Sequence, residues 1–233
     1  MEKYFMPNGE EILREEFIKF YNNCYYVTNS KCVEDEIDSL LKKEIKTRED
    51  FKMILAWKIG RINHKKSRFK GETIFSESWK EKDETKIAKL RNGNELDIYE
   101  LLNLISDNDD LVEESKKDDQ KAQEVLCKIN QTEGIGTVYL ITLLYFISNG
   151  KYPIFDQFAS AAVNAITKGK KPGEKVSINN LPDRKNIDNL LIGDKTKGYL
   201  KFKRDIEKIF KYYDYQNNRD VDRALWVYGH LFT

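Results

Sequence analysis

The sequence has few cysteines, histidines and prolines, with 3, 2 and 4 of them among 233 residues. Cys24, Cys32 and Cys127 are an odd and scattered set, which argues against a disulfide framework or a cysteine-ligated cluster and indicates reduced thiols. His64 and His230 are isolated in the sequence. We therefore expect no metal site, with His64 in a basic loop where it can contact phosphate and His230 in a structural role.

An apolar run long enough to span a membrane is also missing. No stretch of about eighteen apolar residues is present, which argues against a membrane-spanning helix. The N-terminal stretch, MEKYFMPNGEEILREEF, has no apolar segment either, so we expect no signal peptide. Hydrophobic residues make up 40% of the chain and charged residues 34%, which is typical of a globular protein rather than a disordered one. We expect a cytoplasmic protein without a membrane partner.

Charge of one sign does not dominate, because the chain contains 40 Lys and Arg residues and 39 Asp and Glu residues, and its net charge is +1. This balance argues weakly against a nucleic-acid partner. The basic residues nevertheless cluster at 58–70, 168–175 and 195–211, and the acidic ones near 107–119. Segregated charge is what a one-sided DNA-binding protein requires. Each cluster taken alone also fits a solvated loop or helix face.

Apolar residues recur at helical spacing along most of the chain, and no alternating run indicates a strand. Thr47 and Asp50 have the spacing of an N-terminal capping box. Residues 25–28 fit either a short strand or an extended turn, and the polar, basic residues 63–93 are expected to form a long loop or insertion. The pattern predicts an all-α or nearly all-α protein. Helices are expected over residues 10–22, 33–45, 51–62, 98–105, 122–129, 137–147, 157–166, 202–213 and 221–228, with a short one at 187–191.

The stretch from Gln131 to Ser160 contains the most specific pattern. Gly134 and Gly136 flank Ile135, so the backbone can turn tightly and approach a partner closely. The apolar residues that follow predict a helix over 137–147 that is buried all round, and Asn149-Gly150 is expected to end it. A plain turn between two helices is the simpler interpretation of the glycines.

Asp156 follows an apolar pair and precedes the next expected helix. Aspartate is among the best N-cap residues, so a purely structural role would explain its position. A carboxylate held at a helix N-terminus is also positioned for chemistry. The two interpretations are compatible.

This stretch resembles the helix-hairpin-helix DNA glycosylases, most closely bacterial proteins with the 8-oxoguanine DNA glycosylase fold. The resemblance is carried by GIG, the buried helix and YPIFDQFA, in which Asp156 lies twenty positions after Gly136. A weaker similarity extends to DFKMILAWKIGRI and DVDRALWVYG. The resemblance implies two helical subdomains with a cleft between them. Residues 95–182 would form the helix-hairpin-helix subdomain, and residues 1–94 and 183–233 would form the other.

The resemblance also implies roles for the hairpin at residues 134–136 and for Asp156. Gly134, Ile135, Gly136 and Thr137 would bind a phosphate of double-stranded DNA through backbone amides and a hydroxyl. Backbone carbonyls of the hairpin would hold a monovalent cation, and no other cofactor is required. The carboxylate of Asp156 would stabilise positive charge on the deoxyribose during cleavage of the N-glycosidic bond.

A base that is flipped out of the duplex needs aromatic faces for stacking. Phe158, Trp226 and Tyr228 are the candidates for such a pocket, although each also fits a place in the core. Val138 occupies the position where bifunctional relatives carry a nucleophilic lysine, two residues after Gly136, and Lys151 is the nearest substitute in the sequence.

The resemblance therefore predicts a monofunctional, monomeric DNA glycosylase that excises a damaged or modified base during DNA repair. An alternative is a catalytically inactive DNA-binding protein of the same fold in a defence or regulatory role. An unrelated helical interaction protein is the third interpretation. The hairpin fits the first two interpretations equally, and Asp156 favours the enzyme.

Overall fold

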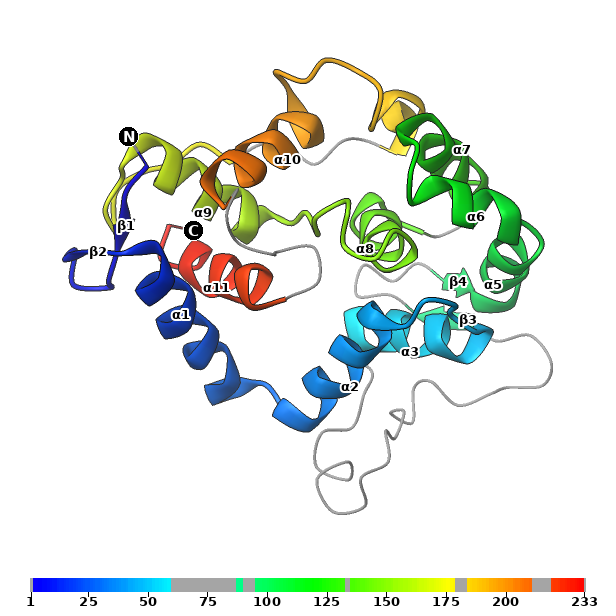
Figure 1. The fold of residues 1–233 in the computed structure, drawn as a ribbon, viewed down its shortest axis with the longest axis horizontal. Helices are drawn as coiled ribbons and strands as arrows, with labels where there is room; N and C mark the ends of the chain where they lie inside the picture. The colour runs from blue at the N-terminus through cyan, green and yellow to red at the C-terminus, as the bar shows by residue number, and fades with distance from the viewer. Residues whose placement is uncertain are drawn as a thin grey trace. The chain divides into compact units, whose positions relative to one another are not determined.

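The computed structural model describes residues 2–59, 87–89, 95–132, 135–178, 184–210 and 219–232 of the chain. It is mostly helical (Figure 1), which confirms the prediction of an all-α or nearly all-α protein. Within the described residues, no helix combines the length and the apolar composition that crossing a membrane requires. The helices are α1 (Arg14–Thr28), α2 (Lys31–Lys42), α3 (Arg48–Ile59), α5 (Ile98–Ser106), α6 (Asp109–Ser115), α7 (Asp119–Ile129), α8 (Thr137–Ile147), α9 (Gln157–Lys168), the 3-10 helix η2 (Arg184–Asn189), α10 (Gly198–Ile209) and α11 (Asp220–Gly229).

Two short hairpins add a small amount of strand. The strand β1 (Tyr4–Phe5) pairs with β2 (Glu11–Ile12), and β3 (Ile87–Lys89) pairs with β4 (Glu95–Asp97), both antiparallel. Strands of two or three residues are too short to produce an alternating pattern, so they could not be recognised in the sequence. Most of the loop expected over 63–93 lies outside the described residues.

Several helix ends follow from local side-chain chemistry. The backbone N–H of Thr47 donates to Oδ2 of Asp50 over 2.6 Å, and the N–H of Asp50 donates to Oγ1 of Thr47 over 3.4 Å. This reciprocal pair is the expected capping box at the start of α3. The start of α1 differs from the prediction, because residues 11 and 12 pair in β2 and the helix begins at Arg14.

The far end of α1 settles a point that the sequence left open. Residues 25–28 continue the helix to Thr28 and form neither a strand nor an extended turn. Tyr25 is buried, and its ring lies 5.5 Å from that of Trp226 in α11. Packing against α11 therefore accounts for the additional helical turn, and only the tertiary structure supplies that contact.

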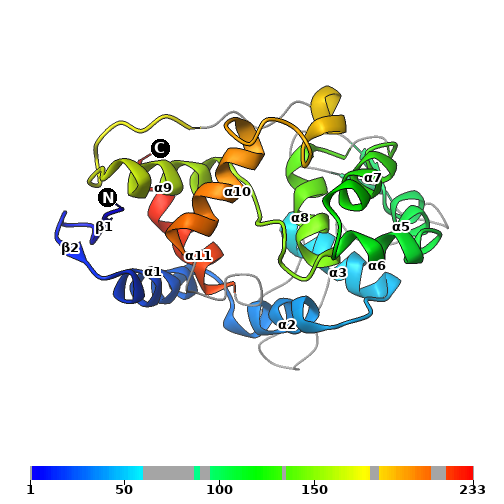
Figure 2. The ribbon, with the colours of Figure 1, turned by 45° about the horizontal axis from the view of Figure 1, so that its top comes forward.

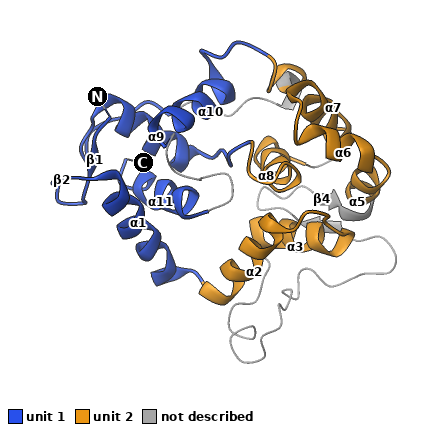
Figure 3. Cartoon of the chain, in the orientation of Figure 1, with its two compact units in different colours: residues 1–29, 152–182, 193–233 blue, residues 30–151, 183–192 orange. Residues whose placement is uncertain are grey.

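The chain forms two compact units, each assembled from separate segments (Figure 3). Unit 1 contains residues 1–29, 152–182 and 193–233, and unit 2 contains residues 30–151 and 183–192. The division into 1–94, 95–182 and 183–233 that the sequence suggested stays a prediction. Gly136 and α8 belong to unit 2, whereas Asp156 and α9 belong to unit 1.

In unit 1, α11 packs between α1 and α9 (Figures 1 and 2). The ring of Tyr228 lies 4.9 Å from that of Phe17 and 5.0 Å from that of Tyr21. On the α9 side, a Cβ added to Gly229 would lie only 2.0 Å from the carbonyl oxygen of Phe158. Glycine therefore permits the close approach of the two helices.

In unit 2, α8 lies in the interior and contacts α3 and α7. Its burial agrees with the continuous apolar run in the sequence. The 3-10 helix η2 is joined to α7 through the buried amide of Gln123. The Nε2 of Gln123 donates to the carbonyl oxygen of Ile187 over 2.7 Å, and the Oε1 of Gln123 accepts from the N–H of Leu191 over 2.8 Å.

Candidate functional site

Only some of the residues expected to form the hairpin before α8 are described in the structure. Glu133 and Gly134 lie outside the described residues, so the expected role of Gly134 stays a prediction. Ile135 is buried, and Gly136 is the N-cap of α8 with a φ of −95°. A Cβ added to Gly136 would lie 3.7 Å from Cδ2 of Tyr139, which is an ordinary contact distance. The fold itself therefore does not require glycine at position 136.

The start of α8 has the electrostatic character expected of an anion-binding helix end. The N–H groups of Tyr139 and Leu140 donate to the carbonyl oxygen of Gly136 over 3.0 and 3.2 Å. Gly136 has no side chain with which to cap the helix, and Thr137 is the first helical residue. A helix N-terminus carries a positive partial charge, which attracts phosphate groups. This geometry is compatible with the expected phosphate contact.

Asp156 is fixed at the N-terminus of α9. Its Oδ1 accepts a hydrogen bond from the backbone N–H of Ala159 over 2.9 Å, so the N-cap interpretation is confirmed. Among the described residues, Oδ2 takes part in no hydrogen bond or ion pair. Asp156 is half-buried, and its backbone is extended. One carboxylate oxygen therefore orients the group while the other is available to a ligand.

The turn before Asp156 agrees with the sequence analysis. The helix α8 ends at Ile147, and Asn149 and Gly150 follow with positive φ angles of 50° and 88°. The N–H of Gly150 donates to the carbonyl oxygen of Tyr145 over 2.8 Å and closes the last turn. The Asn149-Gly150 pair thus ends α8 as expected.

Two of the three aromatic candidates, Phe158 and Trp226, lie together. Phe158 and Trp226 are half-buried, and their ring centroids are 5.9 Å apart. His230 is exposed and stacks on Phe158, with a centroid separation of 3.5 Å and an angle of 13° between the ring planes. The Nδ1 of His230 also lies 2.7 Å from the carbonyl oxygen of Trp226.

His230, for which the sequence predicts only a structural role, thus belongs to this cluster. The spacing of four residues between Trp226 and His230 places them on one face of α11 and could have indicated it. Tyr228, by contrast, is completely buried against Phe17 and Tyr21. Tyr228 is therefore in position to support the core of unit 1 rather than to line a pocket.

Val138 and Lys151 are the two positions that the resemblance connects with a nucleophilic lysine. Val138 is the second residue of α8 and is half-buried. The Nζ of Lys151 lies 2.9 Å from Oδ1 of Asp119, which opens α7. The amine of Lys151 is thus held by a carboxylate within unit 2.

The basic clusters are partly neutralised by nearby carboxylates. On α10, Lys203 pairs with Glu207 over 2.6 Å, and Lys201 pairs with Asp205 one turn away. Most of cluster 58–70, including His64, lies outside the described residues. Ion pairs within a helix reduce the positive field that a cluster presents, so the lysines of α10 attract DNA less strongly than their number in the sequence suggests.

No metal centre emerges from the described part of the chain, where no three His, Cys, Asp or Glu side chains are grouped to hold an ion. Cys24, Cys32 and Cys127 are free cysteines. Burial raises the pKa of the Cys24 and Cys127 thiols, which reduces their reactivity as nucleophiles. These groups add no chemistry to the residues around Asp156.

Similarity to other proteins does not add to this assignment. Comparisons with protein-family models, curated proteins and solved structures found no match. The functional interpretation therefore depends on the residues expected to form the hairpin, on Asp156 and on the cluster of Phe158, Trp226 and His230.

Proposed function

We propose that the chain is a monofunctional DNA glycosylase of the helix-hairpin-helix type, which hydrolyses the N-glycosidic bond of a damaged or modified base in double-stranded DNA. One observation carries the proposal. The buried helix α8 follows Gly136 and ends before the Asn149-Gly150 turn, and Asp156 then caps α9; this order of elements is the one that the resemblance implies. The two-subdomain glycosylase fold is part of the same proposal.

The carboxylate of Asp156 would serve the chemical step. Departure of the base develops positive charge on the deoxyribose, and a fixed negative charge beside the sugar stabilises it. The hydrogen bond from the Ala159 N–H to Oδ1 holds the group in place. Oδ2 would then face the sugar or orient the attacking water, as carboxylates do in glycoside hydrolysis.

The start of α8 would hold the DNA backbone. The amides and hydroxyl at Gly136 and Thr137 would bind a phosphate at the positive end of the helix. Carbonyl groups of the same hairpin would hold a monovalent cation. A phosphate contact of this kind positions the duplex without reading its sequence.

The flipped base would be bound by the aromatic cluster of Phe158, Trp226 and His230. Phe158 lies two residues after Asp156, and its ring already stacks on His230. A base could take the place of the imidazole or extend the stack with Trp226. Base-to-aromatic stacking contributes about 1–3 kcal/mol for each base, which is enough to compensate for part of the energy of unstacking.

The product would be an abasic site in an intact strand. Strand cleavage by a Schiff base needs an amine that attacks the sugar. Val138 has none, and the amine of Lys151 pairs with Asp119 over 2.9 Å. We therefore expect no covalent complex when borohydride is present during the reaction.

A panel of duplexes, each with one modified base, tests the proposal. The protein should produce abasic sites in at least one duplex, and these should become strand breaks only after alkali treatment. Salt-dependent DNA binding without abasic sites on any duplex would instead support an inactive DNA-binding protein of this fold. A borohydride-trapped adduct would contradict the monofunctional assignment, and its loss in Lys151→Ala would identify the amine.

A further inference from the structure

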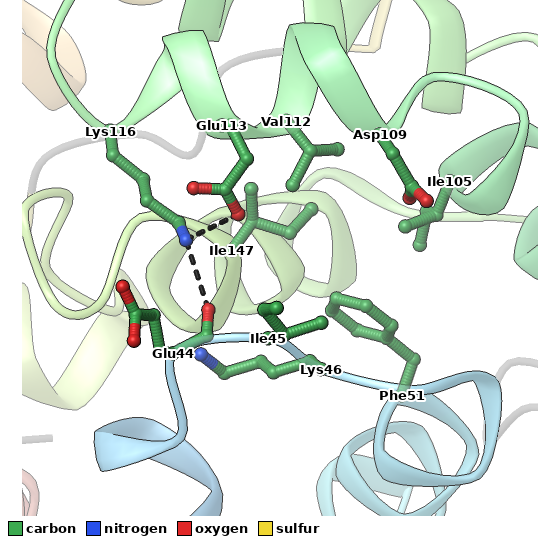
Figure 4. A pocket seen from close by; sticks show the side chains of 10 residues that line it. All are labelled: Glu44, Ile45, Lys46, Phe51, Ile105, Asp109, Val112, Glu113, Lys116 and Ile147. Carbon is green, nitrogen blue, oxygen red and sulfur yellow. Dashed lines mark hydrogen bonds and ion pairs between the residues drawn. The ribbon is translucent and has the colours of Figure 1, made fainter.

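Unit 2 contains a pocket at the end of α8 opposite the hairpin (Figure 4). Its volume is about 380 Å³, which is sufficient for a small organic molecule. The helix α8 has 11 residues, from Thr137 to Ile147. At the rise of an α-helix, its two ends are about 15 Å apart. The pocket is therefore separate from the proposed phosphate contact. Its apolar lining consists of Ile45, Phe51, Ile105, Val112 and Ile147.

An ammonium group without a carboxylate partner lies in this pocket. The Nζ of Lys46 donates to Oδ1 of Asn149 over 2.6 Å and to the carbonyl oxygen of Lys43 over 2.8 Å. Both acceptors are neutral. Among the described residues, no carboxylate lies within ion-pair distance of Lys46. A half-buried cation of this kind is well suited to an anionic ligand.

The acidic groups that act on Lys46 are already engaged. Glu113 pairs with Lys116 over 2.6 Å, and Asp50 pairs with Lys43 over 2.5 Å. The Nζ of Lys116 donates in addition to the carbonyl oxygen of Glu44 over 3.0 Å (Figure 4). Two lysines thus face the pocket, and the carboxylate of Glu113 neutralises only one of them.

The surroundings of Lys46 also shift its pKa. Burial and the neighbouring ammonium of Lys116 lower the pKa of Lys46 to about 8. Lys43 lowers this pKa further. Asp50 and Glu113 raise it, but by less than the other effects lower it. The carboxyl groups of Glu44 and Asp109 also line the pocket. Neither of these carboxyl groups forms an ion pair with Lys46, so the carboxylate of a ligand would supply the charged partner that the Lys46 ammonium lacks.

We propose that this pocket binds a small carboxylic acid with an apolar body. The carboxylate would accept a hydrogen bond from the ammonium of Lys46, and the apolar body would lie against Phe51, Ile105 and Val112. Ile45, which is 73% exposed in the structure, would close over the ligand and lose contact with water. The site is independent of the proposed glycosylase activity.

Three ligands with the same apolar body test the charge requirement. Phenylbutyrate, phenylbutanol and phenylbutylamine are titrated separately into the full-length protein in a calorimeter. The carboxylate should bind most tightly, the alcohol more weakly and the amine least. Equal binding of all three, preference for the amine or no binding of the carboxylate would overturn the proposal.

Two further measurements place the ligand at Lys46. Lys46→Met should weaken phenylbutyrate binding by about tenfold or more, as loss of one charge-assisted hydrogen bond predicts. Lys121→Met, on the surface of α7 in the same unit, should leave binding unchanged. Unchanged binding in Lys46→Met would refute the site.

The second measurement needs no variant. At about pH 8, where the pKa of Lys46 lies, carboxylate binding should be coupled to uptake of part of a proton. The apparent binding enthalpy at pH 8 should then differ between phosphate and Tris buffers, and no such difference should be found at about pH 6 between two buffers that titrate there, because the amine is already charged. Binding without proton uptake at pH 8 would exclude Lys46 as the partner of the carboxylate.

Discussion

The closest approach of α9 and α11 makes Gly229→Ala a severe test of the packing in unit 1. An added Cβ would lie 2.0 Å from the carbonyl oxygen of Phe158 and 2.5 Å from its carbonyl carbon. Ordinary contacts begin at about 3.5 Å, so the helices would have to separate by roughly 1.5 Å. The obstacle is backbone, and no flexible side chain can move aside.

The expected magnitude combines two opposing effects. Overpacking costs about 1–3 kcal/mol, and a backbone clash belongs at the upper end of that range. Alanine recovers up to about 1 kcal/mol of helix propensity. The net loss of unfolding free energy is therefore about 2 kcal/mol, which corresponds to a decrease in Tm of about 4–8 °C for a chain of this size.

A matched variant separates this packing effect from a general effect of replacing glycine. In Gly136→Ala the added Cβ would lie 3.7 Å from the nearest side-chain atom, so its stability should stay within about 1 kcal/mol of wild type. Thermal and urea unfolding of both variants gives the comparison, and near-UV circular dichroism reports on the rings of Phe158 and Trp226. A Gly229→Ala protein as stable as wild type would refute the close helix contact.

Three further predictions concern stability. Burial raises the pKa of the Tyr21 and Tyr228 hydroxyls above 10.0. As the pH rises, the unfolded chain therefore loses these protons before the folded protein does, and the free energy of unfolding should fall above about pH 10. Urea unfolding should show a smaller fall in Tyr228→Phe. Asp118→Ala removes the acceptor of two first-turn amides of α7, at 2.7 and 3.0 Å, and should cost about 1 kcal/mol by the same measurement, with Asn costing less. Gln123→Ala breaks both hydrogen bonds to the segment around η2 and should cost about 2 kcal/mol, with faster amide hydrogen exchange at Leu191.

The sequence predicted helix ends where local chemistry marks them. Thr47 and Asp50 form their capping box, and Asp156 caps α9 through side-chain oxygens whose donors lie within three residues. Asn149-Gly150 ends α8 because this pair adopts positive φ angles readily. These features need only neighbours in the chain, so they can be read without a tertiary structure.

Features that depend on distant contacts could not be predicted in this way. The last turn of α1 is helical where Tyr25 packs against Trp226. The stack of Phe158 on His230 joins α9 to α11, and the sequence contains only the spacing within α11. Nothing in the sequence distinguishes Lys46 from the other lysines, because its burial and the proximity of Lys116 arise only when α3, α6 and α8 assemble.

The most direct test of the proposed function is base excision by Asp156→Asn under single-turnover conditions, on a duplex that the wild-type protein processes. Asparagine can still accept the Ala159 N–H, and it is as good an N-cap as aspartate, so folding and DNA affinity should be retained. The missing negative charge should slow excision by about a hundredfold or more. Excision at the wild-type rate by a folded, DNA-binding Asp156→Asn protein would contradict the assignment of this carboxylate to the chemical step.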